Sequence, residues 1–369
     1  MQRLVTSQNK NQVETKDTGC SGCLQDALTG YKGSGICHII YSAKGTGRRI
    51  FMQGKLKRED CMSFEGFCTY IKNGIQQKLG YSCQVMTHNY LKNNGVTLCG
   101  LTVMSMESNI SPTIYLNGFY ERYVYEAESL QQIETDVMET YRRNKTDHNL
   151  DVSFFTEWEN ARQRIIFKLV NYEANRELLK DVPYKKVLDL AMVFTCLVEK
   201  GVTGSATILI HNHHMECWKV TEEDLFHAAM ENTPYFQKKK MAGMNSVIEY
   251  LTGKKVDDVI EDCSANMYIL TVEDNLNGAG AILYPDVLKG IAEKMRCKTF
   301  FIIPSSIHET IIVPMFSEDD FEALSKMVKE VNATQLAPEE ILSDHVYLYK
   351  SEDNTISMQD QSFYLSDLW

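Results

Sequence analysis

Two alternating segments on either side of an Asn-Gly pair decide the first part of the fold. They read CQVMTHNYL (83–91), KNNG (92–95) and VTLCGLTVM (96–104). Asn-Gly between such segments is a strong signal for a β-hairpin, because both residues tolerate the positive φ that a tight turn needs. The apolar register slips across Gly100, which predicts a β-bulge there. The sequence therefore predicts an antiparallel hairpin over 83–104.

Further elements surround this hairpin. Apolar residues recur at helical spacing over 63–79, which predicts a helix with one apolar face that ends at Gly80. Downstream we expect one strand and two helices, at 113–116, 118–126 and 129–143. These elements make an N-terminal α-β-β-β-α unit, residues 62–150.

The following part of the chain, 151–356, is expected to be the main α+β domain packed against that unit. Two largely apolar runs, 154–171 and 183–199, indicate helices, the second beginning at Pro183 and buried on several sides. Asp189 within it is a buried or half-buried acid, for which we expect a partner such as Lys185 or Lys186, or a role as a cap elsewhere, with catalysis the less favoured role.

Strands and helices alternate in the last third. A helix is expected to begin at Thr221 and end at 232–234. Strands are expected at 267–272, 281–284, 299–303, 307–313 and 346–349, and helices at 285–295 and 321–331. The polar end after Ser351 is expected to fray, with 357–369 as a flexible tail. The sequence thus predicts an α+β protein with mixed sheets and helices, the N-terminal unit being followed by a larger helical and α/β part.

Composition restricts the function classes. The 369 residues are 44% apolar and 24% charged, with a net charge of −11. An acidic chain disfavours binding to duplex nucleic acid, which needs a basic face. No apolar run reaches the 18 residues of a membrane span, and the polar start shows no signal peptide, so we expect no membrane and a cytoplasmic location. Eleven cysteines at scattered spacings do not indicate a disulfide framework, and the C-x-x-C pair Cys20 and Cys23 lacks a second pair at zinc-site distance.

Residues 1–61 differ from the rest. They hold ten Lys or Arg residues and five acids, a net charge of +5, which leaves −16 for the remainder. One interpretation is a disordered basic arm. We favour another, in which translation begins at Met62, because residues 57–60 are what a purine-rich ribosome-binding site would encode. The nucleotide sequence decides between a disordered and a mis-annotated extension.

One segment concentrates polar chemistry. A buried-looking strand over 206–210 leads into His211, Asn212, His213 and His214. On a strand, His211 and His213 would share one face about 6.5–7 Å apart, which suits two ligands of one divalent metal. His308 is the best remote third ligand, and His308 and Glu309 are the candidate catalytic groups. The favoured alternative is that His211 and Asn212 satisfy backbone groups where the strand leaves the sheet.

Several strings together resemble a bacterial family of unknown function over about 62–356. They are Asn94-Gly95-Val96, Gly100-Leu101, NISPTIYL (109–116), Phe119-Tyr120, DVSFF (151–155), 208–214, NTP (232–234), 304–309 and VNATQ (331–335). The stretch from Trp218 to Asn232 resembles, more loosely, a second uncharacterised bacterial family of intracellular proteins. Neither resemblance implies a reaction, a cofactor or a catalytic residue.

Two functions follow from these observations. We expect a soluble, non-enzymatic interaction or regulatory protein with an unknown protein partner, because no catalytic motif has the required spacing. The rival is a metal-assisted hydrolase, in which His211, His213 and His308 or Glu309 hold a metal whose bound water is the nucleophile.

Overall fold

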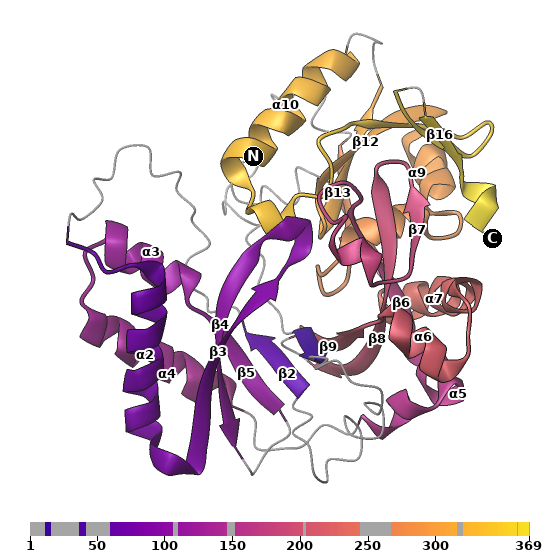
Figure 1. The fold of residues 1–369 in the computed structure, drawn as a ribbon. Helices are drawn as coiled ribbons and strands as arrows, with labels where there is room; N and C mark the ends of the chain where they lie inside the picture. The colour runs from indigo at the N-terminus through magenta and orange to yellow at the C-terminus, as the bar shows by residue number, and fades with distance from the viewer. Residues whose placement is uncertain are drawn as a thin grey trace.

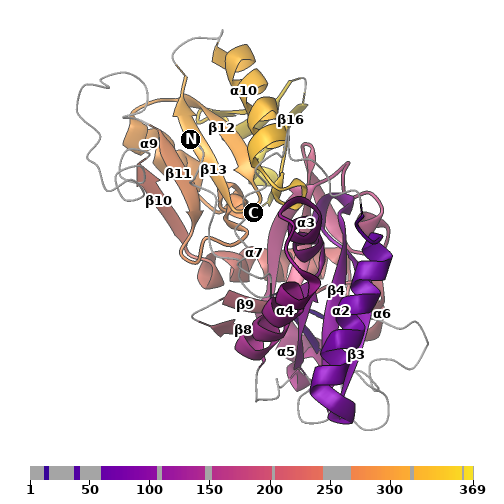
Figure 2. The same cartoon turned by 90° about the vertical axis from the view of Figure 1, so that its left-hand side faces the viewer.

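A computed structural model describes residues 12–15, 37–41, 60–105, 110–145, 152–201, 204–243, 267–315, 320–359 and 361–368 of this chain. Within these ranges the strands form a five-stranded, a seven-stranded and a four-stranded sheet, with helices packed against them (Figure 1). The predicted α+β class is confirmed. Figure 2 shows the seven-stranded sheet and the N-terminal helices at opposite ends of the molecule.

The N-terminal unit has the predicted order. Helix α2 (Phe64–Leu79) begins after Ser63, whose hydroxyl accepts a hydrogen bond from the Gly66 amide, and ends at Gly80, where φ is 69°. Strands β3 (Cys83–Leu91), β4 (Thr97–Ser105) and β5 (Ile110–Tyr115) follow, and then helices α3 (Asn117–Tyr125) and α4 (Leu130–Asn144). These elements share one apolar core.

The predicted bulge at Gly100 is wrong. The β3–β4 pairing runs without a break from Cys83 opposite Ser105 to Leu91 opposite Thr97. Gly100 is required for a different reason, because a Cβ there would lie 2.4 Å from the Thr113 side chain and 2.5 Å from the Tyr90 ring. The glycine therefore allows close packing across the sheet.

Two segments of the predicted extension are strands. Strand β2 (Cys37–Tyr41) pairs in parallel with β5, and β1 (Gln12–Thr15) pairs antiparallel with β2. The sheet order β1-β2-β5-β4-β3 is therefore mixed. A disordered arm does not describe these two segments. The Cys20 and Cys23 pair lies outside the described residues.

The two helices predicted in the middle of the chain are wrong. Residues 154–171 form a short 3₁₀ turn, the one-turn helix α5 (Trp158–Ala161), the 3₁₀ turn η4 (Arg162–Arg164) and strand β6 (Ile165–Asn171). Residues 183–199 belong to the hairpin of β7 (Tyr184–Val187) and β8 (Leu190–Gly201). Strand β9 (Gly204–Leu209) pairs with β8 and completes the four-stranded sheet. Both runs are apolar because β6 and β8 are buried on both faces.

Two helices follow β9. Helix α6 (Asn212–Trp218) begins directly after the strand, and α7 (Glu222–Phe236) begins at the predicted N-cap, Thr221, whose side chain accepts a hydrogen bond from the Asp224 amide. Helix α7 continues through Pro234 and does not end before it. A proline has no N–H to donate to the carbonyl four residues earlier, and Pro234 lies in the last turn, so α7 loses a single backbone hydrogen bond near its end.

The seven-stranded sheet has the order β10-β11-β13-β12-β14-β15-β16. Its strands are β10 (Lys239–Gly243), β11 (Tyr268–Val272), β12 (Thr299–Ser306), β13 (Glu309–Pro314), β14 (Tyr347–Lys350), β15 (Thr355–Met358) and β16 (Gln361–Tyr364). Its helical elements are η7 (Gly278–Leu283), α9 (Val287–Met295), α10 (Asp320–Gln335), η8 (Pro338–Glu340) and η9 (Leu365–Leu368).

Two predictions fail in this region. The strand expected at 281–284 is largely the 3₁₀ helix η7, whose side chains fill the core under the sheet. The tail does not fray, since β15 and β16 pair and Leu365 and Leu368 are buried. Burial of apolar side chains supplies the free energy that orders this end of the chain.

The tip of the β3–β4 hairpin fastens the N-terminal unit to the rest of the molecule. The Asn94 side-chain amide donates to the carbonyls of Pro338 (2.7 Å) and Ile341 (2.6 Å), and Asn93 donates to the carbonyl of Glu339 (2.7 Å). Asn94 is left-handed, with φ 59°. The Asn-Gly turn thus also fixes the segment 337–346, which runs from η8 to β14.

Candidate functional site

The first candidate region is the histidine corner, which we define as His211, His213 and His214 at the start of α6. The predicted strand before it is confirmed, but the histidines lie on the helix start and not on the strand. His211 is the N-cap, and its amide donates to His214 Nδ1 at 3.0 Å. Its own Nδ1 lies 2.7 Å from Asp181 Oδ2. The interpretation that His211 and Asn212 satisfy backbone groups at the strand exit holds for Asn212, whose side-chain amide donates to the carbonyl of Lys180 at 3.3 Å, whereas the His211 ring contacts Asp181.

The three imidazole rings lie close together. Ring centroids are 5.8 Å apart for His211 and His213 and 3.9 Å apart for His213 and His214. His214 is buried against Phe155 and Trp218. Burial, with a smaller contribution from the neighbouring histidines, lowers the pKa of His214 to about 2. This ring is therefore neutral at physiological pH and serves as a hydrogen-bond acceptor in the cap.

His308 lies in the turn between β12 and β13 of the seven-stranded sheet, and Glu309 is the first residue of β13. His308 Nδ1 accepts a hydrogen bond from the Asn277 amide at 3.3 Å, and its carbonyl accepts one from Thr271. Within the described part of the chain, no group of three or more His, Cys, Asp or Glu residues is arranged to hold a metal ion. The structure therefore does not bring His211, His213 and His308 together as one metal site.

Glu309 instead belongs to a carboxylate group around η8. Burial and the nearby Glu340 carboxylate raise the pKa of Glu309 to about 7. Burial and Glu339 raise the pKa of Glu340 to about 7 as well. Two half-buried acids that titrate near neutrality form a pH-sensitive pair beneath the docked hairpin tip.

A polar node that the sequence did not reveal surrounds Asp189. Its Oδ1 accepts a hydrogen bond from the Tyr347 hydroxyl at 2.6 Å, and its Oδ2 accepts one from the Ser343 hydroxyl at 2.6 Å. His345 Nδ1 lies 3.0 Å from the same Oδ2. The partners of Asp189 are therefore these three residues, and the expected pairing with Lys185 or Lys186 is wrong.

The backbone at this node is strained. Leu188, immediately before Asp189, has φ 54°, a conformation that a leucine rarely adopts. The turn between β7 and β8 holds this geometry and points the Asp189 carboxylate at the segment 337–346. Tyr347 is fully buried, and burial together with the Asp189 charge raises its pKa well above the ordinary value. The node thus consists of one carboxylate that accepts from several donors in a nearly dry environment.

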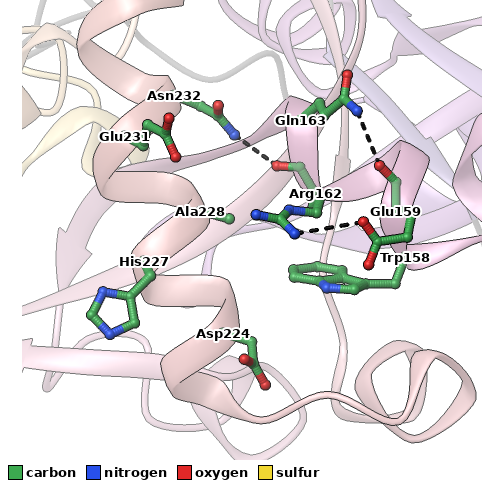
Figure 3. A pocket seen from close by; sticks show the side chains of 9 residues that line it. All are labelled: Trp158, Glu159, Arg162, Gln163, Asp224, His227, Ala228, Glu231 and Asn232. Atoms are coloured by element: carbon green, nitrogen blue, oxygen red, sulfur yellow. Dashed lines mark hydrogen bonds and ion pairs between the residues drawn. The ribbon is translucent and has the colours of Figure 1, made fainter.

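A pocket of about 420 Å³ lies beside the histidine corner, between α5 and η4 on one side and α7 on the other (Figure 3). Its walls are formed by Trp158, Glu159, Arg162, Gln163, Asp224, His227, Ala228, Glu231 and Asn232. The Trp158 ring packs on Trp218 with 5.7 Å between centroids, and Trp218 in turn packs on His214. The aromatic stack therefore links the pocket to the histidine corner.

The pocket is predominantly acidic. Glu159, Asp224 and Glu231 line it, against one arginine, Arg162, which lies 3.5 Å from Glu159. Figure 3 shows the Asn232 side chain of α7 reaching towards Arg162, whereas the His227 ring points away from Trp158 and Arg162. Hydrogen bonds from Thr221 lower the pKa of Asp224, so this carboxylate stays ionised. A pocket lined by an indole ring and three carboxylates is suited to a cationic group.

Neither the pocket nor the Asp189 node was predicted from the sequence. One feature of the sequence could have indicated the pocket: Asp224, Ala228 and Glu231 recur at helical spacing and so lie on one face of α7. The node had a partial signal in Asp189 itself, an acid within an apolar run. Its partners lie more than 150 positions later, so no local pattern joins them.

The comparison with protein families confirms the resemblance expected over about 62–356. Residues 64–351 match the model of a family of unknown function, DUF5688. The match covers more than half of the chain, so the chain belongs to this family. No curated protein and no solved structure matches it. The looser resemblance of residues 218–232 to a second family is not shown and stays a prediction. Among the described residues, no helix has the length and apolar character needed to cross a membrane.

Proposed function

We propose that this chain is a non-enzymatic, cytoplasmic interaction protein, and that the pocket between α5 and α7 receives a cationic side chain of a partner protein. One observation carries the proposal: three carboxylates and an indole line the cavity, against a single arginine. A lysine or arginine side chain matches both features, since its charge pairs with carboxylates and its cation lies favourably over an aromatic face.

The architecture of the walls supports recognition more than catalysis. Asn232 is held by its side-chain amide, which donates to the carbonyls of Arg162 (2.7 Å) and Ile165 (3.0 Å), so α7 is fixed relative to η4. Trp158 is fixed by its packing on Trp218. Glu159 remains 79% exposed, however, so its attraction for a ligand is screened by water and salt. We therefore expect weak, salt-sensitive binding.

The nature of the partner follows from charge and compartment. The chain has a net charge of −11, which favours a basic protein segment over nucleic acid. The seven cysteines whose side chains the structure describes are free thiols, as expected in a reducing compartment.

A binding titration of the full chain tests this proposal. The probe is a lysine- and arginine-rich peptide at low salt, compared with the same peptide carrying glutamine at the basic positions. Glu231→Gln should weaken binding of the basic peptide roughly three- to tenfold, because it removes one wall charge. The matched control is Glu222→Gln on the same helix but outside the pocket, which should bind like the wild type. Equal binding of both peptides, or equal loss in both variants, would overturn the proposal.

A second candidate function is acid–base chemistry at His345. The Asp189 carboxylate contacts Nδ1 of His345, so Nε2 is the ring nitrogen left for a substrate, and the His345 side chain is 35% exposed. A carboxylate orients a catalytic imidazole through the same kind of contact. Nitrogen-15 NMR should then find the proton of neutral His345 on Nδ1, and a proton on Nε2 would remove this candidate. The metal-assisted hydrolase with His211, His213 and His308 stays a prediction that no described metal-holding group supports.

A further inference from the structure

Asn94, at the tip of the β3–β4 hairpin, uses its whole side-chain amide to bind the rest of the molecule. Its Nδ2 donates to the carbonyls of Pro338 (2.7 Å) and Ile341 (2.6 Å), and its Oδ1 accepts from Asn175 Nδ2 at 2.9 Å. Its backbone amide donates to Asn175 Oδ1 at 2.9 Å. Asn175 is only 2% exposed, so water competes little for this pair. We call these four hydrogen bonds the Asn94 contact.

The next residue is Gly95, and an Asn-Gly pair can react with itself. The Gly95 backbone nitrogen attacks the side-chain carbonyl carbon of Asn94, an approach that no side chain on the glycine obstructs. The new N–Cγ bond closes a succinimide ring while the Cγ–Nδ2 bond breaks. The departing nitrogen takes up the proton that the Gly95 nitrogen loses and leaves as ammonia. Water then opens either ring carbonyl, which gives an aspartate or an isoaspartate at position 94.

We propose that Asn94-Gly95 is a modification site, at which this deamidation releases the hairpin tip from the segment 337–346. The product carboxylate has no N–H to donate, and it would face the two carbonyl oxygens that now lie 2.6 and 2.7 Å from Nδ2. Glu339 and Glu340, in the same turn as one of these carbonyls, add negative charge. An isoaspartate also adds one carbon to the main chain of the hairpin turn. Both products therefore oppose docking.

The docked tip protects the amide from this reaction. Ring closure requires Cγ to turn toward the Gly95 nitrogen, so the Asn94 side chain must first leave Pro338, Ile341 and Asn175. Reaction therefore proceeds from molecules in which the tip has opened locally. Opening is reversible before deamidation, and the new carboxylate makes it permanent. The segment 337–346 also carries His345, and the inference uses neither the pocket nor the proposed function.

The sequence supplies an internal comparison, because it holds three more Asn-Gly pairs, at 73–74, 117–118 and 277–278. Asn73 lies within α2 and is exposed, so a negative charge at this position is solvated by water. Conversion of Asn73 should therefore leave the docking of the hairpin unchanged. The same chemistry at two positions thus separates the effect of the Asn94 contact from that of deamidation in general.

Peptide mapping of the full chain, incubated at mildly alkaline pH, tests the protection. Mass spectrometry measures the rate at which Asn94 becomes aspartate or isoaspartate in the wild type and in Asn175→Ala. The variant removes two of the four hydrogen bonds, so we expect Asn94 to react roughly tenfold faster. The rate at Asn73 in the same samples is the control and should not change. Equal rates at Asn94 in both proteins would overturn the proposal.

Hydrogen–deuterium exchange tests the release. Asn94→Asp, which mimics one product, should exchange faster than the wild type in the hairpin tip and in the segment 337–346, and the matched variant Asn73→Asp should exchange like the wild type there. Wild-type chains deamidated at Asn94, separated by anion exchange, give the same measurement without a substitution. Unchanged exchange in the segment 337–346, or an increase spread evenly over the whole chain, would show that the carboxylate does not release the tip.

Discussion

The histidine corner and the segment 337–346 each place an imidazole beside a carboxylate, but they do so in different surroundings. His211 Nδ1 lies 2.7 Å from Asp181 Oδ2, and the Asp181 side chain is 67% exposed. His345 Nδ1 lies 3.0 Å from Asp189 Oδ2, and the Asp189 side chain is 14% exposed. The shorter of the two Asp–His contacts, Asp181–His211, is thus the one whose carboxylate is more exposed to solvent.

Solvation, rather than distance, should decide what each pair contributes. Water competes for the exposed pair and screens it, so its partners lose little when separated. The Asp189 carboxylate also accepts from Ser343 and Tyr347, which are almost entirely buried and have no access to water. Removing an acceptor there leaves buried donors without a partner. The following predictions test this contrast.

The largest effect is expected for Asp189→Asn. The amide nitrogen replaces one carboxylate oxygen, so at least one of the donors Tyr347 or Ser343 loses its acceptor, and we expect a loss of about 3 kcal/mol in the free energy of unfolding. Urea denaturation followed by circular dichroism measures it. The control is Asp344→Asn in the same segment, an exposed acid that accepts from Asn332 at 2.8 Å and should lose less than about 1 kcal/mol. Equal losses in both variants would refute the contrast.

The histidine corner should respond to acid through His214. Its pKa of about 2 lies below the ordinary 6.5, so under pH 6.5 the unfolded chain binds a proton that the folded protein does not. The stability that the neutral ring maintains is complete above pH 6.5 and is lost progressively as the pH falls toward 2. Between pH 7 and pH 5 the loss from this group is about 2 kcal/mol. His214→Asn keeps an acceptor near the Nδ1 position without this titration, so its stability difference from the wild type should shrink over that interval.

How far the sequence predicts this fold depends on the range of the interactions. The first helix and the hairpin of the N-terminal unit were predicted correctly, because a helical repeat and an Asn-Gly turn are local signals, whereas β1 and β2 were not predicted as part of its sheet. Strands β6 and β8 were mistaken for helices, because burial on both faces removes the alternation that identifies a strand. The β7–β8 turn is also hidden, since Leu188 takes a positive φ where glycine or asparagine is expected.

The candidate sites show the same limit. The segment 206–214 was correctly identified as a strand that leads into histidines. His211 and His213, however, were expected to alternate along the strand, whereas the helix α6 begins at Asn212. Asp189 was recognised as an acid in an apolar run, yet its partners come from β14 and the loop before it. Glu309 was predicted to act together with the histidines, but its carboxylate instead interacts with that of Glu340, whose charge helps to raise the pKa of Glu309. Pairings across such distances follow from the topology of the sheets and not from spacing.

A pH effect of opposite sign is expected at the Glu309 and Glu340 pair. The pKa of Glu309 rises from 4.5 to about 7 on folding, so the acid costs nothing below pH 4.5, and the cost grows as the pH rises to 7. Glu309→Gln should therefore stabilise the protein by about 1 kcal/mol at pH 8 and leave it unchanged at pH 4. Glu322→Gln, an exposed position on α10, should show the same small effect at both pH values. If Glu309→Gln destabilises at pH 8, the carboxylate is required there in its ionised form.

The smallest effect is expected at the exposed pair, for Asp181→Asn. The asparagine still reaches His211, and water already solvates the position, so the loss should stay below about 0.5 kcal/mol in urea denaturation. The His211 cap should persist, because its second contact, the amide on His214 Nδ1, does not involve Asp181. A loss above about 1.5 kcal/mol would mean that the shorter Asp–His contact is the stronger one. Distance, and not solvation, would then rank the two pairs, and the distinction between the histidine corner and the segment 337–346 would fail.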